Sequence, residues 1–562
     1  MRFSLFFILL LPTLSYGQVK KFPGHTRGVE AIRKHQKHLS QIAKKYGKTT
    51  NDLQTFIKND RSVVLNQNGD IFISDESLVS PYLESSDGII NPSATQIPDS
   101  DTFKLHSRPA SPLKIVLDLD GHVVTTPYWN GGNTINALPY DIDGIAGFST
   151  DELVRIREIW LRVAEDFAPF DVDITTEEIP DAQLYSSGGG MRVILTPSST
   201  WYGSAGGVAY LNSFTWGLPV PAWVFAKLLG NSPSKVAEAA SHEIGHTLGL
   251  SHQTLYDESG NFVYEYNPGN ALWAPIMGNS YGKALTTWHH GTAYSPKTLQ
   301  DDVSLIKKIL PANADEASGN LQTSSATLKT IEEGGLVNFR HQGMINFRSD
   351  VDVLNVPIGT GSLLLNVSGP YHASNLDLKV RLLNSSGTLL AEANPSGSGP
   401  VALSFDHLTA DLYKMEVSTS GVDGYYSDYG LQGRYYITGT AQPNYDYPEE
   451  PVLNSAPVVS AGPDSKIILP ESQVSLIGSA SDQDGAIISV EWKQVSGPGN
   501  AILSSVNIPN IIASGLVSGQ YVFRFTAVDD LGSSSSDDVV VSVSSSTTKK
   551  GGGGGTGGPR RK

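Results

Sequence analysis

The chain of 562 residues contains no cysteine. This absence excludes disulfide bonds and lipid-modified cysteine side chains. Exported eukaryotic proteins with several domains usually carry disulfides, so a cysteine-free chain of this length favours a bacterial secreted protein. A length of 562 residues also predicts several domains rather than one.

Long apolar runs are lacking too. The run Phe6-Phe7-Ile8-Leu9-Leu10-Leu11 follows Arg2 and precedes the small residues Ser15 and Gly17. It is too short to span a bilayer, and the pattern predicts a signal peptide over residues 1–17 and a secreted, extracellular protein, possibly associated with the cell surface. A formal net charge of -16 argues against nucleic acid as a partner.

The chain does contain one dense cluster of metal-ligand residues, His242-Glu243-Ile244-Gly245-His246-Thr247-Leu248-Gly249-Leu250-Ser251-His252. Residues four apart on a helix share a face, so His242 and His246 can bind one Zn²⁺ with Glu243 beside them. Gly249 can take a left-handed conformation and turn His252 back toward the metal. Three histidines would leave a fourth position for water, as in a catalytic zinc site.

This motif, with Met277 in Trp273-Ala274-Pro275-Ile276-Met277-Gly278 downstream of it, resembles the metzincin clan of zinc endopeptidases. The resemblance implies a secreted metalloendopeptidase in which His242, His246 and His252 hold the zinc, Glu243 is the general base and Met277 forms the methionine turn. Tyr281 stands four residues after Met277 rather than two, so it is not expected to bind the metal; a role in substrate binding is a weaker expectation. The alternative is a non-enzymatic surface adhesin that zinc stabilises.

Residues 18–111 are polar and begin with a basic stretch. Val63-Val64-Leu65 and Ile71-Phe72-Ile73, separated by Asn66-Gln67-Asn68-Gly69, predict a hairpin. By position this region resembles a propeptide, which would make the chain a zymogen. It is expected to cover the cleft until the chain is cut near Arg108-Pro109, although a solvated basic face without inhibitory function is the alternative.

Residues 112–314 are expected to form an α+β metzincin-like catalytic domain, with a twisted sheet and packed helices. Ser149 and Glu152 form a capping-box pattern before an amphipathic helix. Ser232-Pro233 is typical of a helix start and predicts where the zinc helix begins. By resemblance Gly207, Val208, Ala209 and Tyr210 bind peptide substrate by strand addition; a glycine-rich loop is the alternative.

The remaining chain predicts two all-β sandwiches. Residues 320–441 resemble the bacterial pre-peptidase C-terminal domain, residues 442–455 form a linker, and residues 456–545 resemble a PKD-like, immunoglobulin-type sandwich. Residues 546–562 form a Gly-rich basic tail that is expected to be disordered. Asp141–Gly144 and Asp482–Gly485 resemble pieces of calcium loops without the remaining ligands, so Ca²⁺ is possible but unsupported.

Protein or peptide substrates are the expected partners, and the two sandwiches are candidates for binding a surface, polymer or glycoprotein. We expect a monomer without a membrane span.

Overall fold

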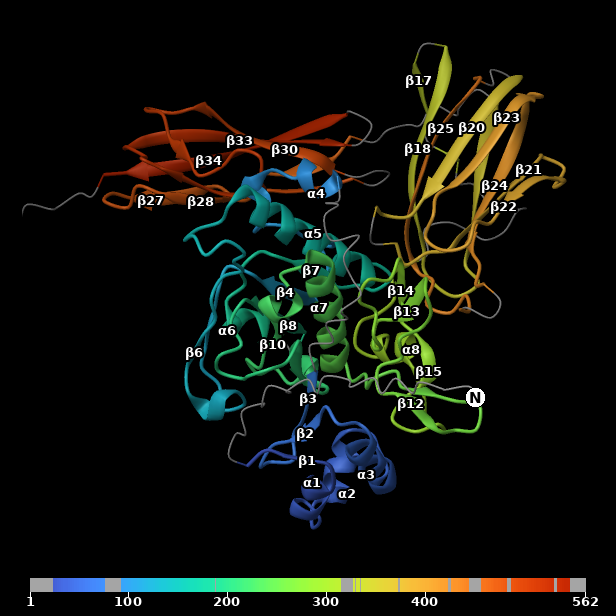
Figure 1. Ribbon diagram of the computed structural model, residues 1–562. Helices are drawn as coiled ribbons and strands as arrows, with labels where there is room; N and C mark the ends of the chain where they lie inside the picture. Colours follow the sequence, from blue (N-terminus) through green and yellow to red (C-terminus); the bar gives the residue numbers. More distant parts are fainter. Residues whose placement is uncertain are drawn as a thin grey trace, which may run out of the picture. The chain divides into compact units, whose positions relative to one another are not determined.

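A computed structural model describes residues 24–75, 92–186, 189–314, 327–328, 330–333, 335–371, 374–422, 426–443, 456–482, 487–529 and 533–545. The predicted signal peptide and the Gly-rich tail lie outside these residues. The chain divides into two compact units, residues 1–447 and 448–562. The first is a mixed α/β region followed by a β-sandwich, and the second is a further sandwich (Figure 1).

An eight-stranded sheet with the order β1-β2-β3-β9-β10-β8-β4-β7 organises the first unit. Its parallel part comprises β4 (Lys114–Asp118), β7 (Asp173–Thr175), β8 (Gly190–Thr196) and β10 (Ala222–Phe225). Next to β10, β9 (Gly207–Tyr210) runs antiparallel. The predicted sheet is therefore present, and β9 is the last strand of its enzyme-like part.

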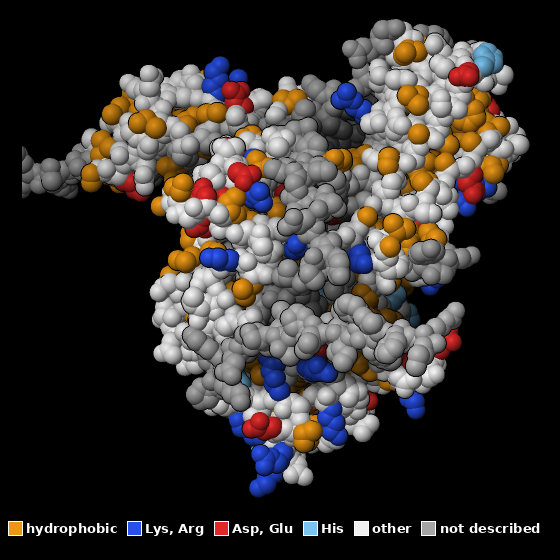
Figure 2. Space-filling view, viewed as in Figure 1, with side chains coloured by type: hydrophobic (Ala, Val, Ile, Leu, Met, Phe, Trp, Pro, Cys, Tyr) orange, Lys and Arg blue, Asp and Glu red, His pale blue; other side chains and the backbone are white. Residues whose placement is uncertain are grey.

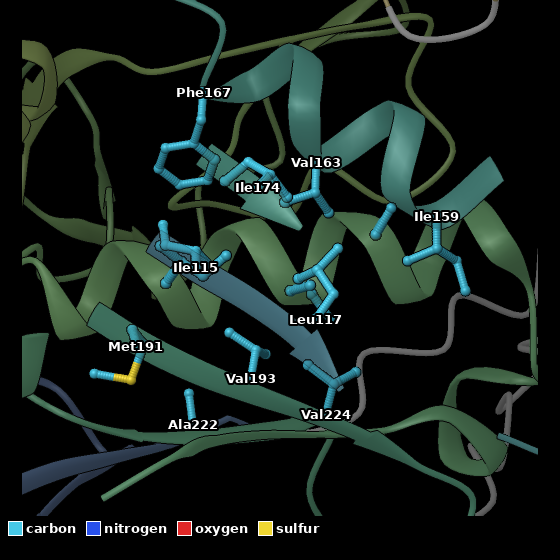
Figure 3. Close-up of a cluster of buried hydrophobic side chains, with 14 of the residues drawn as sticks. Ile115, Leu117, Ile159, Val163, Phe167, Ile174, Met191, Val193, Ala222 and Val224 are labelled. Carbon is cyan, nitrogen blue, oxygen red and sulfur yellow. The ribbon is translucent and has the colours of Figure 1, made fainter. Parts of the chain in front are cut away.

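Two helices pack on this sheet. The first, α5 (Thr150–Asp166), begins at the predicted capping box of Ser149 and Glu152. The second, α7 (Pro233–Thr247), begins at Ser232, whose side chain accepts from the Lys235 amide. Figure 3 shows Ile159, Val163 and Phe167 of α5 against Ile115, Leu117 and Val193 of the sheet. This apolar core fixes the position of α7, which carries the zinc motif.

Short elements complete the α/β region. They are α4 (Pro92–Gln96), η1 (Asp99–Asp101), β5 (Val123–Val124), η2 (Asn130–Gly132), β6 (Ile135–Asn136), α6 (Asp181–Leu184), η3 (Ser213–Thr215), η4 (Ala226–Leu229), β11 (Leu255–Tyr256), β12 (Phe262–Tyr264), β13 (Trp273–Pro275), β14 (Leu285–Thr287), β15 (His290–Thr292), β16 (Leu299–Asp301) and α8 (Asp302–Ile306).

The part before residue 76 forms a small body of its own. Its elements are β1 (Thr26–Arg27), α1 (Gly28–Lys34), α2 (Leu39–Lys45), α3 (Thr50–Asn59), β2 (Val63–Leu65) and β3 (Ile71–Asp75). Leu53, Phe56 and Ile57 of α3 belong to its core. The predicted hairpin is β2–β3, paired antiparallel from Leu65–Ile71 to Val63–Ile73. Figure 2 shows Lys and Arg side chains on the surface of this body.

Residues 92–111 belong structurally with the enzyme-like region rather than with this small body. Arg157 of α5 is 2% exposed and donates to the Ala94 carbonyl, to Asp99 and to Thr102 over 2.7–2.9 Å. The Ser107 amide donates to the Ile174 carbonyl of β7 over 3.0 Å. The predicted propeptide-like region, residues 18–111, therefore has two parts with different packing.

The sandwich after residue 327 has two sheets, of order β17-β18-β25-β20-β23 and β19-β24-β21-β22. The strands are β17 (Thr330–Glu333), β18 (Leu336–Ile345), β19 (Val351–Ile358), β20 (Gly361–Ser368), β21 (Leu378–Leu383), β22 (Leu389–Ala393), β23 (Val401–Leu408), β24 (Asp411–Thr419) and β25 (Gly433–Ala441). Their inward residues form one apolar cluster, as the alternation in the sequence predicts.

This sandwich is joined to α5 by buried polar contacts. Glu165, 1% exposed, accepts from the Arg434 amide over 2.7 Å and from the Arg434 guanidinium over 2.9 Å. Asp166 accepts from the Asn375 amide group over 3.0 Å and from the Ser241 hydroxyl over 2.5 Å. Because Ser241 precedes His242, the contact chain runs from the sandwich to the zinc helix.

The second unit has a separate core around Trp492, Tyr521 and Phe525. Its strands are β26 (Val458–Ser460), β27 (Ser465–Ile468), β28 (Val474–Ile477), β29 (Ser479–Ser481), β30 (Ile487–Ser496), β31 (Ile502–Leu503), β32 (Asn510–Ser514), β33 (Gly519–Asp529) and β34 (Ser534–Ser544).

Among the described residues, no helix has the length and apolar character needed to cross a membrane.

Candidate metal centre

The three predicted histidine ligands converge. His242 and His246 lie one turn apart on α7, and His252 follows the helix end. All three rings are at least 92% buried, and their centroids are 4.8–5.2 Å apart. The group Asp75, His242, His246 and His252 has ligand atoms within 4.8 Å of one another and could hold a metal ion.

The helix ends in the way that brings His252 back. The Leu250 amide donates to the Gly245 carbonyl over 3.0 Å and the Gly249 amide to the His246 carbonyl over 2.9 Å, which is a Schellman motif. Gly249 has φ +99°, and a Cβ there would lie 2.1 Å from Oδ1 of Asn212. The motif glycine therefore serves both the left-handed turn and a close packing contact.

The fourth group, Asp75, was not predicted. Its carboxylate comes from the end of β3 and lies 3.3 Å from Nε2 of His242, 3.2 Å from Nε2 of His246 and 3.0 Å from Nε2 of His252. Four atoms bound tetrahedrally to one Zn²⁺ at about 2.0 Å are about 3.3 Å apart. The donor set and spacing therefore fit zinc, and the expectation of an open fourth position is wrong for the full chain.

The other ring nitrogens explain why Nε2 faces the centre. Nδ1 of His242 lies 2.7 Å from the Ile276 carbonyl, and Nδ1 of His246 lies 2.7 Å from the Leu250 carbonyl. Nδ1 of His252 lies 3.1 Å from Oδ2 of Asp60. A hydrogen bond at Nδ1 places the proton there and leaves the Nε2 lone pair for a metal. Nε2 of His242 and His252 forms no well-aligned hydrogen bond within the described residues, as expected for metal ligands.

Glu243 lies beside this centre and is 1% exposed, with Oε2 unpartnered among the described groups. Burial raises the pKa of the Glu243 carboxyl well above its usual range, and the negative charge of Asp75 raises it further. Burial lowers the pKa of His246 to about 4, which favours the neutral ring that a metal requires. The site therefore combines neutral imidazoles with a carboxyl group poised to exchange a proton.

The strand β9 passes very close to Glu243. A Cβ added to Gly207 would lie 2.1 Å from Oε1 of Glu243, so only glycine fits there without displacement. Met277 is fully buried, and its sulfur would lie 2.4 Å from a Cβ at Gly245. The structure thus packs Met277 beneath the zinc helix, where the predicted methionine turn belongs.

The predicted substrate edge is occupied in this chain. β3 pairs antiparallel with β9 through Phe72–Tyr210, Ile73–Ala209, Ser74–Val208 and Asp75–Gly207. This is the strand addition predicted for a peptide substrate, made instead by the chain's own N-terminal part. Binding of substrate by Gly207, Val208, Ala209 and Tyr210 stays a prediction.

Space beside the zinc motif is small. A cavity of about 20 Å³ is lined by Asp75, His242, Glu243, Tyr266 and Tyr281, with others. That volume suffices for about one water molecule. The Tyr266 hydroxyl donates to Asp75 over 3.1 Å, and its ring lies 4.3 Å from that of His252. A peptide side chain cannot enter while Asp75 is in place.

Sequence reasoning missed Asp60, Asp75 and Tyr266. Asp75 ends the predicted hairpin strand, and a carboxylate after Ile71-Phe72-Ile73 was the available signal. The basic charge of residues 20–48 drew attention to surface attraction, whereas the contacts at the centre are made by two buried carboxylates, Asp60 and Asp75.

Other predicted features lie away from this centre. His122 is 3.2 Å from Asp118 and 3.4 Å from Asp181, beside the buried Arg192, as expected for a structural histidine. Asp141 accepts from the Asp143 and Gly144 amides, which is the turn expected for that sequence. In the other candidate calcium segment, Gln483 to Ala486 lie outside the described residues.

Comparison with known proteins identifies one domain. Residues 461–543 match a family model described as a PKD domain of the KIAA0319-like type. This segment is a PKD domain. A stretch of 85 residues is 35% identical to the dyslexia-associated protein KIAA0319 of Homo sapiens, covering 15% of this chain and 8% of that protein. The KIAA0319-like protein of Mus musculus is 36% identical over 81 residues, covering 14% and 8%.

Two solved PKD domains are also similar. The PKD domain from the KIAA 1837 protein is 34% identical, with a TM-score of 0.16, and covers 17% of this chain and 96% of that structure. The PKD1 domain of the Vibrio cholerae metalloprotease PrtV is 23% identical, with a TM-score of 0.13, and covers 16% and 99%. Because the chain spans 8% of the curated relatives' length, these similarities describe the PKD domain, and the family of the α/β region is not identified.

Proposed function

We propose that the chain is the precursor of a secreted, zinc-dependent metalloendopeptidase of the metzincin type. The observation that carries the proposal is the convergence of three buried Nε2 atoms beside a buried, partly unpartnered Glu243. A structural zinc site has no use for that glutamate, because burying a carboxyl without a full set of partners is costly. A catalytic site requires it.

Each residue has a role in peptide-bond hydrolysis. His242, His246 and His252 hold the zinc, which when bound supplies Lewis-acid activation of a water molecule and of the scissile carbonyl. Glu243 accepts the proton of the attacking water and donates it to the leaving amine. The edge of β9 aligns the peptide backbone, and Gly207 lets that backbone approach Glu243.

The N-terminal part keeps this site inactive. Asp75 takes the fourth corner, β3 occupies the edge of β9, and the charge of Asp75 favours the protonated form of Glu243. Activity therefore requires β3 to leave. This replaces the expectation of simple electrostatic docking by the basic stretch.

A zinc-stabilised adhesin is the second candidate, and one observation favours it. Three histidines and one carboxylate make a closed, four-ligand set, which is typical of structural zinc. In that case Asp75 is a permanent ligand, and its removal weakens zinc binding without producing peptidase activity. In a precursor, its removal opens the site.

The decisive test of the function is Glu243→Gln in a chain whose site is open, the Asp75→Ala variant. We expect zinc content near one per chain to be kept while casein cleavage falls roughly 10²- to 10⁴-fold, because general-base catalysis contributes on that order. Zinc content is measured by atomic absorption and cleavage by a fluorescent casein assay. Unchanged cleavage in the double variant would contradict the role of Glu243.

The proposed location is extracellular, since PKD domains are typical of extracellular proteins. The proposed substrates are proteins or peptides, and the two sandwiches remain candidates for binding a surface, polymer or glycoprotein.

A further inference from the structure

The second N-terminal carboxylate, Asp60, contacts the metal centre from the opposite side to Asp75. It follows α3, is 3% exposed, and its Oδ2 lies 3.1 Å from Nδ1 of His252. Its other oxygen accepts from the Ser62 amide over 3.0 Å and from the Ser62 hydroxyl. Asp60 is therefore held in one orientation, facing the ring of His252.

The three histidines differ in where this support comes from. His242 and His246 are oriented by the carbonyls of Ile276 and Leu250, which belong to the enzyme-like region. The partners that the structure gives for Nδ1 of His252 are Asp60, at 3.1 Å, and the Ser62 hydroxyl, at 3.5 Å. In the described part of the chain, then, the third ligand depends on the N-terminal body for its orientation.

We propose that Asp60 is a positioning residue for His252, so that the N-terminal body assembles the zinc site that it also blocks. A carboxylate on the far nitrogen of a ligating histidine fixes the tautomer and raises the basicity of Nε2. Departure of the N-terminal body removes both carboxylates. It opens the fourth corner, and it leaves His252 less well oriented, so the open enzyme exchanges zinc faster than the precursor.

This inference rests on the proposed zinc site but not on peptidase activity. Its test is the rate at which zinc is released to an excess of a chromogenic chelator, measured on the full chain carrying Glu243→Gln to prevent self-digestion. Loss of such a carboxylate partner typically costs 10- to 100-fold in metal affinity. We expect Asp60→Ala to release zinc about 10- to 100-fold faster than the parent.

The conservative variant separates positioning from packing. Asp60→Asn keeps the volume and one oxygen acceptor, so its release rate should lie between those of the parent and Asp60→Ala. If Asp60→Ala fails to fold by circular dichroism, faster release from Asp60→Asn is the test. Glu30→Ala, which removes an exposed carboxylate of α1 in the same body, should release zinc at the parent rate.

Two further variants separate Asp60 from docking and from Asp75. Phe72→Ala loosens β3 by removing ring contacts with Trp129 and Tyr210 while leaving His252 untouched. It should accelerate release less than Asp60→Ala. In the Asp75→Ala background, Asp60→Ala should still accelerate release by a similar factor.

Equal release from the parent and both Asp60 variants overturns the inference. An Asp60 effect that Phe72→Ala reproduces in full, or that disappears without Asp75, overturns it as well. A parent chain that binds no zinc overturns the proposed function itself, so the two failures are distinguishable.

Discussion

At the scale of single residues, the centre consists of groups that fix one another. Each histidine has an acceptor on Nδ1, and each Nε2 points to the same carboxylate. The spacing of His242, Glu243, His246, Gly249 and His252 predicted this convergence, because helix periodicity and a left-handed turn are local properties. The carboxylates were not predictable, since Asp75 lies 171 residues from His246 in the chain and is brought there by tertiary packing.

The residue that decides between precursor and structural site is Asp75. In the full chain, Asp75→Ala should raise casein cleavage about tenfold or more, because a tethered blocking group acts at an effective concentration near millimolar. Glu30→Ala serves as the matched control and should leave cleavage at the parent level. If Asp75→Ala loses zinc and gains no cleavage, the carboxylate is a permanent ligand and the adhesin is favoured.

At the scale of elements, the pairing of β3 with β9 explains how one edge serves two purposes. The sequence predicted the hairpin β2–β3, the start of α5 and the start of α7, because turn residues and caps are local signals. It also predicted β9 as a binding edge. It did not predict that β3 would fill that edge, because strand pairing between distant segments leaves no periodic signal in either one.

Gly207 tests the function of this edge. In the Asp75→Ala chain, Gly207→Ala should lower cleavage about 100-fold with zinc retained, since a Cβ placed 2.1 Å from Glu243 displaces the catalytic carboxyl. Gly399→Ala is the control, because a Cβ there meets no atom within 4 Å. Cleavage in the Gly207→Ala chain equal to that of the control would show that β9 does not constrain Glu243.

At the scale of the whole molecule, the first sandwich and the PKD domain differ in their relation to the site. The sandwich belongs to the same compact unit as the α/β region and reaches α5 through Arg434 and Asn375. The PKD domain has its own unit and its own core. Composition and turn spacing predicted two sandwiches. They carried no information on which one packs against the enzyme-like region, because interface residues follow no strand period.

The ion pair between Glu165 and Arg434 tests this attachment. Arg434→Ala leaves a buried carboxylate without its partner, which should lower the free energy of unfolding of the first unit by about 3–5 kcal/mol. Arg348→Ala breaks an exposed pair with Asp428 in the same sandwich and should cost about 1 kcal/mol or less. Urea unfolding followed by tryptophan fluorescence measures both. Equal small losses would mean that the sandwich is only loosely attached.

The central claim is that His242, His246, His252 and Asp75 share one zinc ion. The most direct measurement is anomalous X-ray diffraction at the zinc edge from crystals of the full chain carrying Glu243→Gln. The account predicts one peak about 2.0–2.2 Å from the three Nε2 atoms and from an oxygen of Asp75. A chain supplied with zinc that shows no peak among these residues, or a peak from which His252 or Asp75 is turned away, would contradict it.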